Sequence, residues 1–427
     1  MNRTDFRLHT LAALCFCLFM LLSCDDDDKN VKYMLPPAAT IQMTAEQKAM
    51  VAKSNDFSFN LFREVYRQHQ TESQGQKSMF FSPMGATFMM GMMGMMAEGA
   101  EGETQREILK TMCLDEATAR EISQMCEVLI DDVPEADRQV TLKIANAIYT
   151  KKDYNLKKKF KECMDEYYDA DVRSLDFSKT ESLNAINNWA KDKTNGKIQK
   201  IIDRLSPDAV AYILNSIYFN AKWTNQFDRE DTKTETFMTE SGEARQTEMM
   251  NNNAIVACAA NDVMSMVCLP YGSGTVWNMY VMLPNEGKTV DDVLGSLDTE
   301  SWMNVCKGLK NMLLNLKMPK YSTDNIIDMK TALAAIGMTK AFSPNAEFGK
   351  ITDSKNMYIS SMAQRAQINV TEEGTEMVAV STGDLSSLGG GADIFGKGEF
   401  FANRPFVYIV AENNTGAIFF AGVYNGD

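Results

Sequence analysis

Apolar strand segments and helical segments follow one another along this chain without a regular alternation, and this order constrains the fold most. The candidate strands are Val210–Phe219, Val276–Leu283, Phe406–Ala411 and Ala417–Val423. The last two flank Asn413-Asn414-Thr415-Gly416, a turn typical of hairpins. Candidate helices such as Asn184–Lys193 and Asp328–Ile336 lie between strands. A doubly wound sheet would need regular β–α alternation, so the order predicts an α+β fold.

Residues 43–427 contain no obvious repeat and no second linker, which predicts one large domain. Thr44 and Gln47 form a capping-box pattern at the start of a helix that carries Phe57, Leu61 and Val65 at four-residue spacing. A second apolar helix is expected over Gly85–Met96. It contains six methionines, which favour a flexible core helix over a copper(I) site.

Residues 1–23 have the pattern of a signal peptide. Arg3 and Arg7 precede an apolar run over Leu11–Leu22, and this run of 12 residues is shorter than the about 20 needed to span a membrane. Its end, Leu21-Leu22-Ser23-Cys24, resembles a bacterial lipobox, in which the cysteine is lipidated and becomes the mature N-terminus. The alternative is an ordinary signal peptide with an incidental cysteine.

Residues 24–42 are expected to be a lipidated acidic tether and linker. Asp25-Asp26-Asp27-Asp28-Lys29 resembles an enteropeptidase site, but its position after a lipobox is closer to the surface-export signal of Bacteroidetes-type lipoproteins. A solvated charge run is the third interpretation. We therefore expect an exported lipoprotein at the outer membrane or cell surface of a Gram-negative bacterium, anchored at Cys24, with the membrane leaflet left open.

Charge and histidine content exclude several classes of function. A net charge of −14 argues against nucleic acid as a partner and against non-specific adhesion to anionic lipid, so any membrane contact is expected through the lipid anchor only. The chain has two histidines, His9 in the leader and His69. A multi-histidine metal site is thus impossible in the mature chain, and an enzyme is not expected.

The remaining mature cysteines are widely spaced and form no Cys-x-x-Cys motif, so their pairing stays open. They are Cys113, Cys126, Cys163, Cys258, Cys268 and Cys306. Cys268 lies in an apolar run and is expected to be a buried thiol.

Eight segments, in order along residues 43–427, carry a resemblance to a known family. They are Phe80-Phe81-Ser82-Pro83, Asn146-Ala147-Ile148-Tyr149, Trp189 with Thr194–Ile198, Leu214–Phe219 with Lys222-Trp223, Leu269-Pro270-Tyr271, Met318-Pro319-Lys320, Thr371–Glu376 and Arg404-Pro405-Phe406. Together they resemble the serpin family. The resemblance implies three β-sheets, about nine helices and an exposed reactive-centre loop at about 372–400. It also implies a monomer without a cofactor that inhibits serine proteases as a suicide substrate, its cleaved loop entering the central sheet as a new strand.

The resemblance assigns a hinge to Glu372, Glu373, Gly374, Thr375 and Glu376, and an inserting strand to Met377, Val378, Ala379, Val380, Ser381 and Thr382. This segment should be a solvated loop before cleavage and a buried strand afterwards. Residues 377–382 contain no proline and no charge, so every backbone N–H can join a sheet. Thr375, Met377, Ala379 and Ser381 should share one face. Inhibitory members usually have alanine at Met377-Val378, and this difference keeps open a non-inhibitory binding protein or chaperone on the same fold.

The scissile bond has two candidate positions. Counting from Glu372 gives Leu388–Gly389, whereas counting back from Arg404 gives the region of Ile394, so the loop is about six residues longer than usual. We favour Leu388, which suits chymotrypsin-, elastase- or subtilisin-like targets; papain-like cysteine proteases are also possible partners.

Six further residues match family positions that control the central sheet. Lys320 is expected to pair with Glu372 near Trp223, while Ser82 and Asn215 match the place where the sheet parts. Gly85 replaces a usual serine and Gln364 a usual histidine, so either the sheet opens more easily or another hydrogen-bond network substitutes. Separately, the cluster Lys157–Lys159 with Lys161 fits a polyanion site or, more simply, a solvated helix face.

Overall fold

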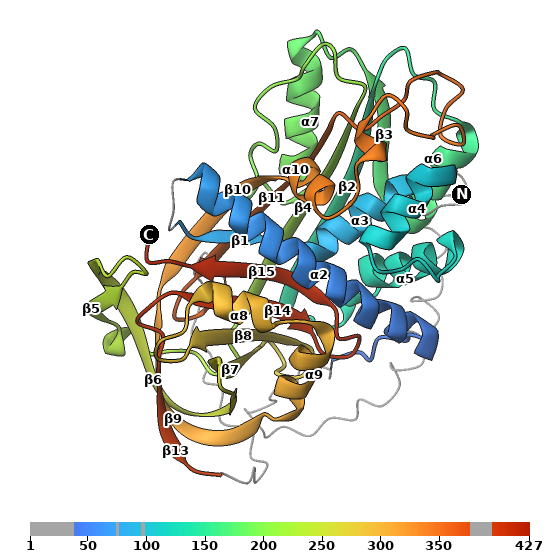
Figure 1. Cartoon of the computed structure of the whole chain (residues 1–427). Helices are drawn as coiled ribbons and strands as arrows, with labels where there is room; N and C mark the ends of the chain where they lie inside the picture. Colours follow the sequence, from blue (N-terminus) through green and yellow to red (C-terminus); the bar gives the residue numbers. More distant parts are fainter. Residues whose placement is uncertain (1–37, 74–76, 95–98, 376–394) are drawn as a thin grey trace, which may run out of the picture. The chain divides into compact units, whose positions relative to one another are not determined.

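The computed structural model describes residues 38–73, 77–94, 99–375 and 395–427 (Figure 1). Cys24, Glu376–Thr382, Leu388 and Gly389 lie outside these described residues.

Six strands form the central sheet, which runs in the order β10-β11-β12-β4-β2-β3. Their bounds are β2 Val140–Lys151, β3 Ala170–Leu175, β4 Ala211–Lys222, β10 Tyr321–Asp328, β11 Ser361–Val370 and β12 Gly374–Thr375. Strands β4 and β11 are parallel, and β12 runs antiparallel to both. Two strands that are distant in sequence thus form the middle of this sheet.

The second sheet has the order β1-β15-β14-β8-β7-β6-β9-β13, with β5 paired to β6. Its strands are β1 Met79–Phe81, β5 Lys233–Met238, β6 Ala244–Ala260, β7 Met264–Tyr271, β8 Trp277–Pro284, β9 Lys310–Pro319, β13 Lys397–Phe401, β14 Phe406–Glu412 and β15 Ile418–Tyr424. The strands join into two hydrogen-bonded sheets rather than three separate ones, because the 17-residue β6 pairs with β7, β9 and β5. All four predicted strands are confirmed.

The described residues contain nine α-helices. They are α2 Ala45–Glu72, α3 Pro83–Gly94, α4 Gly102–Thr111, α5 Ala119–Asp131, α6 Lys158–Tyr168, α7 Thr180–Lys193, α8 Val290–Ser296, α9 Thr299–Lys307 and α10 Met329–Ala335. The helices predicted from residues 44, 85, 184 and 328 onward are present. The capping box is present too: Thr44 Oγ1 accepts from Gln47 N, and the Gln47 side chain accepts from Thr44 N.

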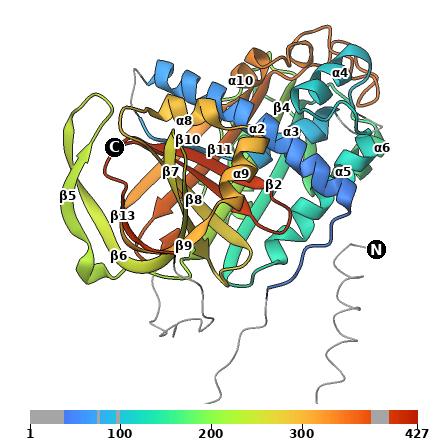
Figure 2. The ribbon, with the colours of Figure 1, turned by 60° about the horizontal axis from the view of Figure 1, so that its bottom comes forward.

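Helix α3 packs against both sheets and forms part of the main core, as its uniform hydrophobicity requires. Met89, Met90, Met92 and Met93 have no exposed surface, which confirms the core interpretation for these four methionines. Helix α2 crosses over α3 (Figures 1 and 2). On the opposite face of the central sheet, α7 covers a smaller core in which Trp189 meets Tyr149 edge to face.

The six cysteines of the described residues are free thiols, and Cys268 is buried as predicted. Within the described ranges, no group of three or more His, Cys, Asp or Glu side chains is arranged to hold a metal ion. No helix in that same part of the chain has the length and apolarity to cross a bilayer.

Candidate functional site

The central sheet is joined in its middle over only part of its length. β4 and β11 pair directly from Tyr212 opposite Ser361 to Ile217 opposite Ala366. Beyond that point the two strands have no register with each other, and β12 lies between them at the far end, with Thr375 opposite both Ala221 and Val370. Residues 218–220 of β4 and 367–369 of β11 therefore flank an unpaired stretch.

A tight turn connects β11 to β12. Thr371 N donates to Gly374 O at 2.8 Å, and Gly374 N donates back to Thr371 O at 3.2 Å. Gly374 has φ +153°, and a Cβ there would lie 2.7 Å from Lys222 Cα and closer still to Ala221 O. Only glycine fits this position, which accords with the hinge expected at Gly374.

Thr375 is 1% exposed and is held by aromatic side chains. Its hydroxyl and that of Tyr271 are 2.5 Å apart. The Tyr271 ring stacks on Trp223 at 4.3 Å between centroids. Trp223 Nε1 donates to Thr371 O at 2.9 Å, and Trp223 N donates to Glu373 O at 2.9 Å. The first residues of the hinge are thus fastened to the end of β4.

Two carboxylates fix the turn from outside. Glu372 accepts from the Thr232 hydroxyl at 2.9 Å and lies 3.5 Å from Lys320 Nζ, while Glu373 pairs with Arg229. These side chains line a pocket of about 420 Å³ beside the hinge. Burial raises the pKa of Glu372, but a backbone hydrogen bond, Thr232 and Lys320 outweigh that effect, so its net pKa is lowered. Glu372 is therefore an ionised, nearly buried carboxylate.

The structure corrects one sequence expectation here. The segment from Glu372 was expected to be a solvated loop before cleavage, yet Glu372 and Thr375 are 4% and 1% exposed. Gly374 and Thr375 already form a strand in the sheet, and the Thr375–Tyr271 contact and the ion pairs stabilise it.

Gln364 organises a buried network where β4 and β11 meet. Its Oε1 accepts from Ser82 N at 2.7 Å, and its Nε2 donates to Ser82 O at 2.9 Å and to Asn215 Oδ1 at 3.1 Å. Asn215 Nδ2 then donates to Asn146 Oδ1 at 2.9 Å. Of the two expected outcomes at this place, a substitute network is therefore the one found.

Gly85 makes room for this network. A Cβ at Gly85 would lie 2.9 Å from Asn215 Cγ and closer still to Asn215 Oδ1 and Gln364 Nε2. Gly85 N donates to Ser82 Oγ at 2.9 Å, and Ser82 Oγ donates to Phe419 O at 2.6 Å. Gly85 and Gln364 are complementary, because the long side chain of Gln364 occupies the space that a side chain at position 85 would need.

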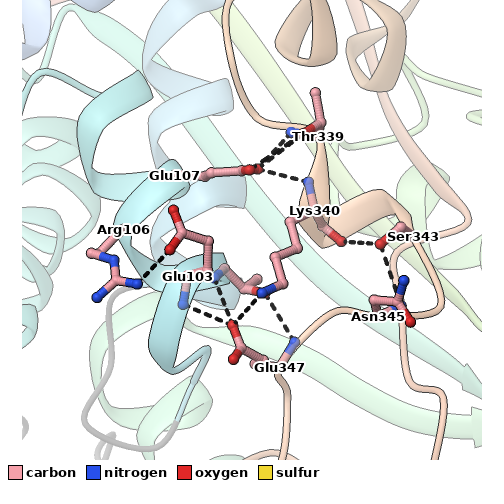
Figure 3. A network of polar contacts seen from close by, with 9 residues as sticks. Glu103, Arg106, Glu107, Thr339, Lys340, Ser343, Asn345 and Glu347 are labelled. Carbon is pink, nitrogen blue, oxygen red and sulfur yellow. Dashed lines mark hydrogen bonds and ion pairs between the residues drawn. The ribbon is translucent and has the colours of Figure 1, made fainter.

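A second polar cluster attaches α4 to the chain segment that precedes β11 (Figure 3). Glu347 Oε2 accepts from Glu103 N at 2.7 Å and Thr104 N at 3.1 Å, and it lies 3.0 Å from Lys340 Nζ. Conversely, Glu107 in α4 accepts from Thr339 N at 2.8 Å and Lys340 N at 2.7 Å. Each segment therefore caps the backbone of the other, which fixes α4 against the chain that leads into β11.

Four residues of the site were missed as functional positions by sequence reasoning. Asn146 and Tyr271 occur in the quoted segments, but nothing in their local pattern links them to Asn215 and Thr375. Arg229 and Thr232 lie in a polar stretch whose only signal is its proximity to Trp223 in sequence. The contacts of Arg229, Thr232 and Tyr271 span more than 100 residues, and that of Asn146 with Asn215 spans 69.

The central sheet is mixed, and the short strand β12 lies between its two parallel neighbours β4 and β11 at one end. In the comparisons with known proteins, the family model "Serpin (serine protease inhibitor)" matches residues 52–426. The chain belongs to the serpin family.

Known relatives and structures are similar over most of their length. An uncharacterized serpin-like protein of Thermococcus kodakarensis is 27% identical, with 88% of this chain and 85% of the relative covered. Human serpin B3 is 26% identical, with coverage of 86% and 97%. Among solved structures, the thermophilic serpin tengpin in its native state has a TM-score of 0.79 at 26% identity, covering 91% and 96%. Human thyroxine-binding globulin complexed with its ligand has the same TM-score and identity, covering 89% and 98%.

Proposed function

We propose that this chain is a suicide-substrate inhibitor of serine proteases and not itself an enzyme. The observation that carries the proposal is the position of β12, which starts a strand between β4 and β11 and points along the unpaired stretch. A protease that cleaves the loop releases the chain after Thr375 to extend this strand. If extension outruns hydrolysis of the acyl-enzyme, the protease is carried along the sheet while still covalently attached.

The registers of β12 support an order of events for the proposed insertion. Extended without a shift, Glu376 would lie opposite Asn220 and Asn369, and the next two residues would complete the unpaired stretch. From Ala379 onward, each added residue must separate a pair of β4 and β11, beginning with Ile217 and Ala366. The first three inserted residues therefore break no pairing between β4 and β11, whereas each later residue must break one.

If the strand extends without a shift, Ser381 would lie opposite Asn215 and Gln364. Side chains directly opposite one another share a face of a sheet. The Ser381 hydroxyl would therefore enter the buried network and could replace the direct bond between Gln364 and Asn215. A small hydroxyl suits this place, whereas an apolar side chain would leave buried amide groups without partners.

The energetic balance favours complete insertion. About nine more residues, up to Asp384 opposite Ser361 and Tyr212, would gain hydrogen bonds on both sides while six direct pairs are lost. With roughly ten hydrogen bonds gained overall at about 1 kcal/mol each, the change is on the order of 10 kcal/mol before side-chain burial. A change of this size makes insertion practically irreversible.

The proposed scissile bond is Leu388–Gly389, with chymotrypsin-, elastase- or subtilisin-like proteases as targets and papain-like cysteine proteases as further candidates. Leu388 supports this because an apolar side chain fits the deep apolar pocket of such enzymes. We further propose that the inhibitor is a monomer attached to the outer membrane or cell surface of a Gram-negative bacterium through lipidated Cys24.

The test is incubation of the protein with chymotrypsin and subtilisin. A complex that survives boiling in detergent, together with a released fragment starting at Gly389 by mass spectrometry, is the expected result. Cleavage without any such complex across a broad protease panel would contradict inhibition, and a fragment starting elsewhere would move the scissile bond.

A non-inhibitory binding protein is the second candidate. It is favoured by the similarity to thyroxine-binding globulin, whose structure holds a ligand, and by the bulky Met377 in the inserting segment. The melting temperature before and after nicking the loop separates the two proposals. A large rise after nicking supports insertion, whereas an unchanged melting temperature supports a binding protein whose loop never inserts.

A further inference from the structure

The direct pairing of β4 with β11 forms a seam in the central sheet, made by residues 212–217 of β4 and 361–366 of β11. Two successive residues of β11 within it, Gln364 and Arg365, carry long polar side chains. Because neighbouring side chains of a strand point to opposite faces, these two residues act on different sides of the sheet. The Gln364 network lies on the side of α3, so Arg365 lies on the side that α7 covers.

Arg365 contacts both sides of the seam. Its guanidinium donates to the Asp324 carboxylate, from Nε to Oδ1 at 2.9 Å and from Nη2 to Oδ2 at 2.6 Å. Asp324 lies on β10, which pairs with β11. The third nitrogen, Nη1, donates to the backbone carbonyl of Lys200. Lys200 belongs to the segment between α7 and β4, so this hydrogen bond crosses from the β11 side of the seam to the β4 side.

The segment that carries Lys200 is fastened on the β4 side. Ile201 N and Ile202 N donate to Asn187 Oδ1 of α7 at 2.9 and 3.2 Å, and Asn187 Nδ2 donates back to Ile202 O at 3.1 Å. Both isoleucines are buried in the smaller core, together with Trp189 of α7. The Lys200 carbonyl is therefore held in place by α7.

The side chain opposite Arg365 on β4 does not hold it. This residue is Ser216, whose buried hydroxyl has no hydrogen-bond partner among the described residues. A pocket of about 550 Å³ lies between residues 201–206 and side chains of β10 and β11, among them Ile326 and Ala363. The hydrogen bond from Arg365 to Lys200 thus connects two parts of the molecule that are not closely packed beside it.

We propose that Arg365 is a clamp that keeps the seam closed on the α7 side, and that breaking its bond to Lys200 limits how fast a further strand can enter. A strand placed between β4 and β11 increases their separation from about 4.8 Å to about 9.6 Å. A hydrogen bond cannot lengthen by about 5 Å, and the bonds of Asn187 oppose movement of the segment with β11.

The position of the clamp along the seam supports this role. Counted from the hinge, Ala366 forms the first pair of the seam, Arg365 the second and Gln364 the third. The two faces are therefore held together at the end of the seam nearest the hinge. The effect on strand entry rests on the proposed inhibitory function, whereas closure of the seam does not.

The test uses three variants of the full chain. Arg365→Gln removes the guanidinium. Asp324→Asn keeps the guanidinium but weakens the ion pair that orients it. The matched control is Arg173→Gln, because Arg173 also pairs through Nε and Nη2 with an aspartate, Asp171, but both residues lie on the outer strand β3.

Hydrogen exchange of the intact protein, followed by mass spectrometry without any protease present, measures how often the seam opens. The exchange of residues 212–217 and 361–366 is compared with that of β14, a buried strand of the second sheet. We expect Arg365→Gln to accelerate exchange in the seam about tenfold and Asp324→Asn about threefold, with β14 unchanged, because a hydrogen bond from a charged donor is lost or weakened. Arg173→Gln should leave the seam unchanged.

Two results would overturn the clamp. Equal acceleration of the seam and of β14 in Arg365→Gln would show a general loss of stability. Unchanged exchange of the seam in both Arg365→Gln and Asp324→Asn would show that the Lys200 bond does not hold it.

Complex formation with chymotrypsin tests the effect on strand entry. More of the cleaved Arg365→Gln molecules than of the cleaved unmodified molecules should end in detergent-stable complexes. An unchanged share, with faster exchange in the seam, would contradict the effect of the clamp on entry. Absence of complexes from the unmodified protein would contradict the inhibitory function itself, while the hydrogen-exchange result would still decide whether Arg365 closes the seam.

Discussion

Replacing Gly85 with serine tests the complementarity of Gly85 and Gln364 most directly. By helix propensity alone, the change from glycine to serine would be slightly favourable, by at most about 0.5 kcal/mol. Here the new Cβ would overlap the amides of Asn215 and Gln364. Overpacking costs about 1–3 kcal/mol, and displacing Gln364 leaves buried hydrogen-bonding groups of Ser82 without partners at about 1–3 kcal/mol. We expect Gly85→Ser to destabilise the native form by about 2–4 kcal/mol.

The companion variant is Gln364→Ala, which removes three hydrogen bonds and leaves a cavity. In the double variant, serine can occupy the space that the glutamine vacates. The loss for the pair should therefore be smaller than the sum of the two single losses by about 1 kcal/mol or more, the coupling expected of residues in contact.

The assay is the urea midpoint of native-state unfolding, followed by near-ultraviolet circular dichroism and converted with a common slope. A second readout is the rate at which the intact protein loses the ability to form complexes with chymotrypsin, because a weaker network should let β4 and β11 separate more often. The reasoning would be refuted by an unchanged midpoint for Gly85→Ser, or by losses that add within about 0.5 kcal/mol.

Three further predictions follow from the described contacts. Thr375→Arg puts an unpaired charge in a buried strand, so cleavage without trapping should increase by about tenfold or more. The Thr375→Val control should still trap protease. The measurement is the ratio of cleaved inhibitor to complex on gels. Burial lowers the pKa of His69, so the unfolded state binds the proton more readily than the native state. The free energy of unfolding should therefore fall as the pH drops from 7 through the unfolded pKa of about 6.5. In His69→Gln the urea midpoint should depend less on pH in that window, and an identical dependence of the midpoint on pH would contradict this. Glu347→Gln should lower the melting temperature more than Glu103→Gln. Glu347 links two segments, whereas among the described residues the Glu103 carboxylate pairs with Arg106 of its own helix. Equal effects would show that the cluster in Figure 3 contributes nothing beyond local helix pairing.

Elements with strong local signals could be predicted from the sequence. The capping box at Thr44, the strand over Val276–Leu283 and the hairpin at Asn413–Gly416 depend on residues close to one another in the chain, so their patterns suffice. The need for glycine at position 374 could be predicted as well, because the backbone angle there suits no other residue.

The contacts that decide how the sheet behaves could not be predicted in this way. Gln364 alone indicated only that a usual histidine was absent, and its partners Ser82 and Asn215 are 282 and 149 residues away. The burial of Thr375 depends on Tyr271, whose position follows from the packing of the second sheet against the first. Likewise, no local pattern shows that one long strand, β6, would join two expected sheets into one.

The buried methionines of α3 would make oxidation a measure of how often the sheet opens. Met89, Met90, Met92 and Met93 are fully shielded in the closed form, and peroxide converts an accessible methionine to its polar sulfoxide. Sulfoxides formed there would report each transient exposure of the helix behind β4, and they would also prevent the helix from packing back. Oxidation at these four methionines would therefore proceed at a rate set by how often they become exposed.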